Sequence, residues 1–199
     1  VGKYISTSAA GVYNISKEMA TLPSSEIAAP INKASFPAYS KEKHNYQALR
    51  ELFYKTTSMV TVIALPASLG LFITADFFVP VVLGEKWIEA IPVVQLLSLF
   101  AFMTSVSSNN GYIFLAIGKP QINTFMSGAR ILSFFIFLFA FDLTKTIEQP
   151  AEALLYSSFI YMLVAYTLLK LEIDLSIKKT IKVNIRAISA TVLMCLTIL

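Results

Sequence analysis

The amino-acid sequence predicts an all-α protein, a polytopic bundle of helices that crosses a membrane several times. Of its 199 residues, 56% are hydrophobic and only 14% are charged, whereas a soluble domain has roughly a quarter of its residues charged. The mean hydropathy is +0.67, too much apolar surface to hide inside a 22.0 kDa globule. We therefore expect most of the surface to face lipid.

Apolar runs long enough to span a membrane occur five times, and a sixth begins near the end of the chain. A spanning helix needs about 20 mostly apolar residues. We treat the chain as a single transmembrane region, and the sixth span as truncated. Because the chain starts at Val1 and ends within an apolar run, we expect a fragment of a longer protein. The expected spans are residues 9–38, 52–83, 88–117, 121–141, 151–169 and 187–199.

The first span is the least apolar and contains Pro23 and Pro30. Proline removes a backbone hydrogen bond and kinks a helix, which a membrane helix tolerates when neighbours satisfy the freed groups. A kinked span that carries charges is expected to face protein or a cavity instead of lipid. The basic segment 38–51, which we call the hinge, connects it to the second span.

Turn residues mark the ends of the later spans. In the second span the helix is expected to loosen near Asp76 and Pro80, before a tight turn at Gly84. The third span ends at the helix-breaking sequence 118–120. The fourth has an aromatic, lipid-facing end and leads into a polar loop at 142–150. A polar, basic link at 170–186 is expected to separate the fifth span from the sixth.

Orientation follows from the distribution of Lys and Arg between the two sides, since cytoplasmic loops of membrane proteins are enriched in these residues. The side opposite the hinge holds Lys3, Lys86 and Lys145. The hinge side holds ten: Lys41, Lys43, Arg50, Lys55, Lys119, Lys170, Lys178, Lys179, Lys182 and Arg186. This bias places the hinge in the cytoplasm.

Several classes of function are excluded or disfavoured by the sequence. The net charge of +4 lies in short clusters between apolar runs, so it indicates membrane topology and no nucleic-acid partner. Cys195 is the only cysteine and His44 the only histidine, which rules out an internal disulfide and disfavours a metal site. No catalytic motif is present and the loops are short, so we expect no enzyme and no cofactor.

Charged residues within the spans are the first candidates for a binding site, because each costs about 2.5–3.5 kcal/mol to insert. Arg130 lies nine residues past Gln121, about 13 Å along the helix and close to mid-bilayer. Its planar guanidinium suits phosphate or carboxylate. The alternative is an arginine that snorkels to the cytoplasmic interface or pairs with a structural acid.

Two further groups of polar residues carry similar alternatives. Glu26 and Lys33 share a face of the first span, and Lys17 lies nearly opposite on an ideal helix. They either meet a ligand, or Glu26 pairs with Lys33. In the third span a polar stripe falls within about 60° on a helical wheel; it either lines a cavity, which we favour, or joins helices. Its members are Ser98, Ser105, Asn109 and Tyr112.

Ordered motifs between residues 11 and 121 resemble those of one family. They are Gly11-x-Tyr13-x-x-Ser16 with Pro23, Pro30 and Phe36-Pro-Ala-Tyr-Ser40, then Leu65-Pro-Ala-Ser-Leu-Gly-Leu71, Val82-Leu-Gly-Glu-Lys-Trp87, Ala90-Ile-Pro92 and Ala116-Ile-Gly-Lys-Pro120. This set is similar to the bacterial polysaccharide-repeat flippases of the lipopolysaccharide/colanic-acid exporter type, within the multidrug/oligosaccharidyl-lipid/polysaccharide exporter superfamily.

The resemblance implies the second lobe of a MATE-like exporter fold, in which two six-helix lobes surround a central cavity. It also implies a transporter of the bacterial inner membrane that flips undecaprenyl-pyrophosphate-linked repeat units for O-antigen, capsule or exopolysaccharide. The partners implied are the lipid-linked oligosaccharide, membrane lipids, and polysaccharide polymerase and chain-length proteins. Our own hypothesis assigns Arg130, Lys17 and Lys33 to the pyrophosphate, and Ser105, Asn109 and Tyr112 to the sugars.

Three other functions stay open at this point. A drug antiporter of the same fold, coupled to protons or sodium, would need an acid in the cavity, and Glu26 or Asp76 is placed to serve. A structural subunit of a polysaccharide assembly complex would need no pathway of its own, and the charges within the spans argue against it. An enzyme acting on the lipid carrier is the least favoured, because no catalytic set is present.

Overall fold

The computed structural model describes residues 7–140 and 146–198, and all regular structure in these ranges is helical. Phe141, Asp142, Lys145, Lys3 and Leu199 lie outside the described residues, so the expectations that involve them are not taken further. The elements are α1 (Thr7–Pro23), a π-helical turn (Ser24–Ala28), α2 (Ala29–Lys41), α3 (Tyr46–Leu83), a 3-10 turn (Glu85–Ala90), α4 (Ile91–Ala116), α5 (Pro120–Ala140), α6 (Gln149–Ile173) and α7 (Ile177–Ile198).

Five helical stretches are long and apolar enough to cross a membrane: α3, residues 85–116, α5, α6 and α7. The prediction of an all-α, polytopic membrane bundle is therefore confirmed. The first expected span is not among the five. It folds as α1 and α2, which are shorter helices separated by the π-helical turn that follows Pro23.

Two expectations about local structure were wrong. The α3 helix does not loosen at Asp76 or Pro80 but continues to Leu83. The basic link at 170–186 is mostly helix, because α6 continues to Ile173 and α7 begins at Ile177. Exposed Ile177, Ile181 and Ile185 alternate there with lysines at helical spacing, so this segment has an apolar face as well as a basic one.

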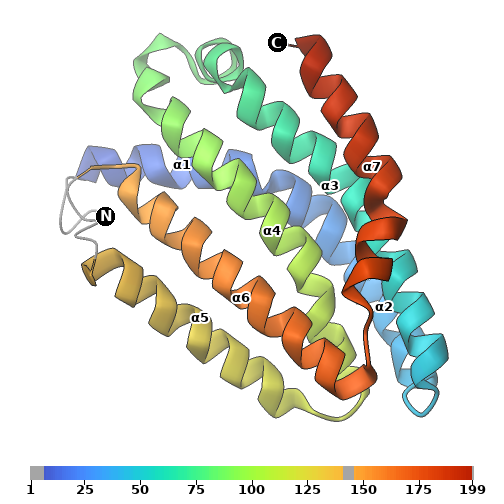
Figure 1. Cartoon of the computed structure of the whole chain (residues 1–199). Coiled ribbons are helices and arrows are strands. Elements are labelled where there is room, and N and C mark those ends of the chain that lie inside the picture. Colours follow the sequence, from blue (N-terminus) through green and yellow to red (C-terminus); the bar gives the residue numbers. More distant parts are fainter. Residues whose placement is uncertain (1–6, 141–145, 199) are drawn as a thin grey trace.

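The central helix of the bundle is α4, which packs against α1, α2, α3, α5 and α6. Figure 1 shows α5 and α6 on one side of it, α3 and α7 on the other, and α1 and α2 behind. Buried aromatic and aliphatic side chains fill the space between α2, α3, α4 and α6. Phe53, Phe114 and Leu169 are among the largest of them that are fully buried.

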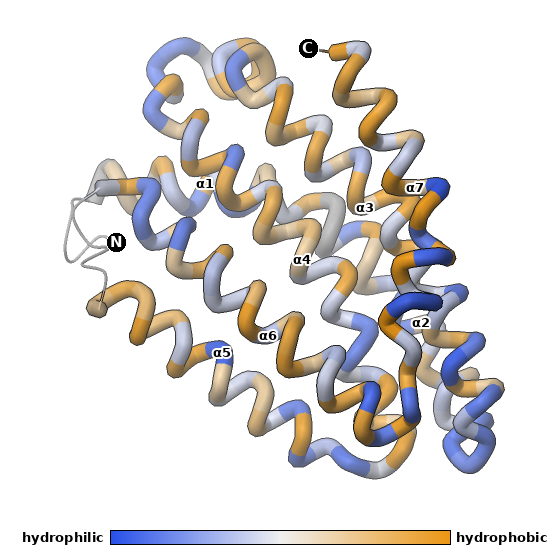
Figure 2. The backbone as a smooth tube through the Cα atoms, viewed as in Figure 1, coloured by the Kyte–Doolittle hydropathy of each residue, from blue (hydrophilic) through white to orange (hydrophobic). Residues whose placement is uncertain are grey.

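Three connections meet at one end of the bundle: the hinge, the α4–α5 turn and the α6–α7 link (Figure 1). Arg50 donates a hydrogen bond to the Ile173 carbonyl at 2.8 Å, and the Ser176 amide donates one to the Tyr54 hydroxyl at 3.0 Å. Ion pairs join Lys119 to Glu172 and Lys179 to Glu51. In Figure 2 this end is mostly hydrophilic. That the basic loops share one end agrees with the predicted topology, and the cytoplasmic assignment stays a prediction.

Candidate functional site

A charged face runs along the outside of α1, the π-helical turn and α2. The opposite side of these helices is packed, with Ser16, Ala20 and Asn32 fully buried. An exposed face with charges of both signs is costly against hydrocarbon, so a water-filled cavity or another part of the protein is the environment that fits it. We call this surface the charged face; its exposed polar members are Asn14, Lys17, Glu18, Ser25, Glu26 and Lys33.

The π-helical turn is what brings Lys17 and Lys33 together on this face. On an uninterrupted α-helix the two side chains would lie about 160° apart, at 100° per residue. A π turn contains one residue more than an α-helical turn, so every later side chain is displaced by about 100° around the helix axis. The angle between Lys17 and Lys33 is thereby reduced to about 60°. Both lysines are exposed. The expected placement of Lys17 opposite Lys33 is thus corrected.

The charges of this face have no ion-pair partner within the part of the chain that the structure describes. The expected alternative, a pair between Glu26 and Lys33, is not formed there. Asp76, the other proposed coupling acid, is also exposed. It lies seven residues before the end of α3, in the half of the bundle away from the hinge.

The polar stripe of α4 lies mainly inside helix contacts. Ser98, Ser105 and Asn109 are fully buried. The Asn109 side chain accepts a hydrogen bond from the Tyr39 hydroxyl at 2.8 Å and donates one to the Thr57 hydroxyl at 3.0 Å. It therefore joins α4 to α2 and α3, which is the helix-joining alternative.

Ser105 donates to the carbonyl of Ala101 at 2.7 Å, within its own helix. The expectation that Ser105 and Asn109 line an open cavity is corrected, because both side chains are fully buried between packed helices. Only Tyr112 of the proposed sugar-facing set is partly exposed, with its ring centroid 6.1 Å from that of Phe36.

Replacing Asn109 by alanine is expected to destabilise the protein by about 1–3 kcal/mol, because two inter-helix hydrogen bonds are lost and Tyr39 and Thr57 keep buried hydroxyls without this partner. Thermal unfolding of the purified full-length protein in detergent measures the effect. The control is Asn14→Ala, an exposed asparagine on α1, which should leave the midpoint unchanged. Equal midpoints for both variants would contradict the role given to Asn109.

Arg130 lies on the opposite side of α4 from α1 and α2, in a cleft between α4, α5 and α6. Its guanidinium carbon is 5.5 Å from the centroid of the Phe100 ring and 5.8 Å from that of Tyr161, within the range of cation–π attraction. The structure thus separates Arg130 from Lys17 and Lys33, which had been assigned to one ligand. Arg130 is partly buried and lines a cavity of about 120 Å³ with Tyr161 and hydroxyl-bearing residues of α4 and α6.

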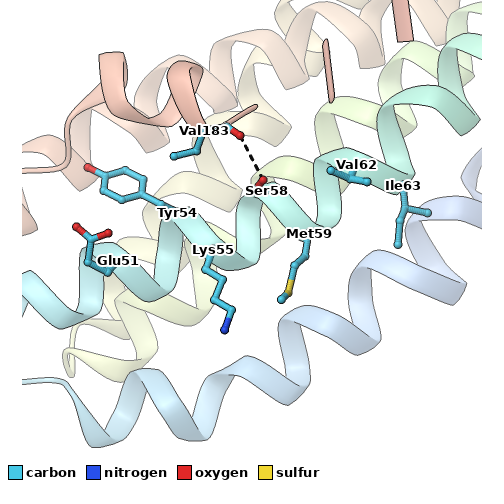
Figure 3. Close-up of a pocket in the computed structure, with 8 residues that line it drawn as sticks. All are labelled: Glu51, Tyr54, Lys55, Ser58, Met59, Val62, Ile63 and Val183. Atoms are coloured by element: carbon cyan, nitrogen blue, oxygen red, sulfur yellow. Dashed lines mark hydrogen bonds between the residues drawn. The ribbon is translucent and has the colours of Figure 1, made fainter. Parts of the chain in front are cut away.

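A groove between α3 and α7, with a volume of about 610 Å³, was not predicted (Figure 3). Glu51 and Lys55 lie toward its hinge end, and Met59 and Ile63 lie further along α3. The Ser58 hydroxyl donates to the Val183 carbonyl at 3.4 Å. The isoleucine spacing at 177, 181 and 185 was the sequence signal that this segment is helical. The basic composition of residues 170–186 had instead indicated a polar link between two spans.

Comparisons with known proteins show that the chain is similar to proteins of bacterial polysaccharide biosynthesis. Residues 1–92 match the family model described as a polysaccharide biosynthesis protein. The chain is 27% identical over 177 residues to the teichuronic acid biosynthesis protein TuaB of Bacillus subtilis (strain 168), covering 89% of this chain and 37% of that protein. No solved structure matched.

Two further relatives are similar over shorter stretches. The lipopolysaccharide biosynthesis protein WzxC of Escherichia coli (strain K12) is 35% identical over 123 residues, which is 62% of this chain and 25% of that protein. The succinoglycan biosynthesis transport protein ExoT of Rhizobium meliloti (strain 1021) is 26% identical over 99 residues, 50% of this chain and 20% of that protein. The chain thus spans about a third or less of the length of these relatives.

Proposed function

We propose, on the premise that this chain is a relative of bacterial polysaccharide-biosynthesis membrane proteins, that it forms part of a flippase for lipid-linked oligosaccharide repeat units. The family match over residues 1–92 and the named relatives confirm the resemblance predicted from residues 11–121. The transport step is not enzymatic: the substrate crosses the inner membrane without a change in its covalent bonds.

The observation that carries this proposal is the charged face of α1 and α2. Lys17 on α1 and Lys33 on α2 are spaced along the charged face and exposed on it, so a lipid-linked pyrophosphate can interact with them in succession. A charge-assisted hydrogen bond from lysine to a phosphate oxygen is among the stronger polar contacts. Glu18, Glu26 and Asn14 on the same face offer acceptors for sugar hydroxyls.

The proposal also requires a second part of the full-length protein opposite the charged face. A charged face within a membrane needs a polar counterpart, and a first lobe across a central cavity would supply it. In that arrangement this chain is most of the second lobe of a MATE-like exporter fold, with the hinge in the cytoplasm. A proton or sodium ion, if the cycle is coupled to one, would use Glu26 or Asp76, whose carboxylates are exposed.

The flippase proposal is tested by deleting the full-length gene and following the lipid-linked repeat unit. We expect the repeat unit to accumulate on the cytoplasmic leaflet, where a sugar-oxidising reagent reaches it in inside-out vesicles but not in intact spheroplasts. Re-expression should restore polymer export. Accumulation on the outer leaflet would instead place the protein after the flipping step, as a subunit of an assembly complex. A drug antiporter would leave export intact and lose drug resistance with Glu26→Ala or Asp76→Ala.

A further inference from the structure

The Arg130 side chain carries a charge that nothing in the described part of the chain neutralises. It lies ten residues from each end of α5, about 15 Å along the helix. Within residues 7–140 and 146–198 its guanidinium has no ion-pair or hydrogen-bond partner, only the two aromatic rings. A partly buried cation at this depth is costly unless an anion accompanies it.

Three buried hydroxyls in the same cavity also lack partners. They belong to Thr104, Ser107 and Ser158, and none of the three forms a hydrogen bond with any residue that the structure describes. All three line the cavity of about 120 Å³ beside Arg130. Since buried polar groups are nearly always satisfied, a cation with several free O–H donors indicates a compact anion with more than one acceptor oxygen. A phosphoryl group has this chemistry.

An apolar cleft lies next to this cavity. It has a volume of about 440 Å³ and shares Arg130 and Tyr161 with the polar cavity. Between α5 and α6 it is lined by Ile131, Phe134, Phe135 and Leu154. Ile131 and Phe135 are exposed on the surface that faces lipid in a membrane bundle. A polar pocket that shares two lining residues with a neighbouring apolar cleft matches an amphiphile with a small anionic head.

We propose that the cleft between α4, α5 and α6 binds a phosphorylated lipid, with its phosphoryl group on Arg130 and the three hydroxyls and its hydrocarbon chain along Ile131, Phe134 and Phe135. The site is separate from the charged face, because α4 lies between them. At this depth the phosphoryl group is far from both headgroup layers. The cleft is thus a site that a lipid phosphate would occupy while it crosses from one leaflet to the other. Only this assignment to the crossing rests on the proposed function.

The binding test uses the full-length protein in a neutral maltoside detergent, with dodecyl phosphate as the probe. A ligand that binds only the folded state raises the unfolding midpoint, and we expect a rise of about 5 °C for wild type. Arg130→Gln should abolish the rise. Arg186→Gln, which removes an exposed arginine from α7, should keep it. The proposal is overturned if wild type shows no rise, which would mean that water or another part of the protein satisfies the cavity, or if Arg130→Gln keeps the full rise.

Two further measurements test which part of the ligand is bound and provide a second variant in case Arg130→Gln does not fold. Inorganic phosphate at the same concentration should give no rise, and an equal rise would overturn the role of the hydrocarbon chain. Ile131→Trp fills the apolar cleft from its exposed side, where it does not disturb the packing, and should abolish the rise with dodecyl phosphate. An undiminished rise in this variant would contradict the proposed cleft even if Arg130→Gln could not be purified. None of these readouts depends on flipping.

Discussion

Export of surface polysaccharide is expected to fall by more than about a hundredfold when Lys17 and Lys33 are both changed to glutamine in the full-length protein. Both lysines lie on the charged face, exposed and without an ion-pair partner in the described residues. A hydrogen bond to a charged group contributes about 1.5–3 kcal/mol, so losing two from the transport path exceeds two powers of ten. Polymer per cell, at equal amounts of membrane protein, measures the effect.

The controls separate this from a general effect of charge. Lys178→Gln with Lys182→Gln removes two exposed positive charges from α7 and should leave export near the wild-type level. Lys17→Arg with Lys33→Arg retains both charges and should retain most of the export. Normal export by the double glutamine variant would remove the charged face from the transport path.

Arg130→Ala is expected to abolish export at normal protein levels, because the mid-depth cleft would lose the one charged side chain among its described lining residues. Arg130→Lys should restore export only in part, since lysine keeps the charge but lacks the planar fork that holds two phosphate oxygens. The measurement is the same polymer assay, with Arg186→Ala as the matched control. Wild-type export by Arg130→Ala would contradict a role in transport.

The export and binding experiments answer different questions about Arg130. If Arg130→Ala exports normally while Arg130→Gln loses the dodecyl phosphate effect, the cleft binds lipid but lies off the path. If export is lost while dodecyl phosphate never stabilises wild type, Arg130 serves transport without holding a phosphoryl group. The fates of the two proposals are thus distinguishable.

Much of the bundle was predictable because a membrane imposes simple demands on a sequence. Hydrocarbon thickness fixes the length of an apolar run, so the helices that became α3, α4, α5 and α6 were expected close to their observed ranges. The motifs between residues 11 and 121 were enough to identify the relatives. Arg130 was singled out by its depth alone.

The predictions were wrong where the composition of a segment suggests one environment and its packing in the fold gives another. The segment 177–186 is basic enough to resemble a loop, yet Ile177, Ile181 and Ile185 give it an apolar face and it forms the first half of α7. Asn109 looked polar enough for a cavity, but its hydrogen bonds to Tyr39 and Thr57 involve residues 70 and 52 positions away along the chain. No local pattern can reveal such partners.

The sequence by itself determined that this protein is a helical membrane bundle, which residues carry charge within it, and which proteins it resembles. These properties depend on the length and composition of each segment. Only the tertiary structure decided which charges share a surface. The π-helical turn brings Lys17 and Lys33 onto one face, α4 separates them from Arg130, and α6 supplies Tyr161 and Ser158 to the Arg130 cleft. Helix phase and helix packing set these relations, and both depend on contacts between residues far apart in the chain.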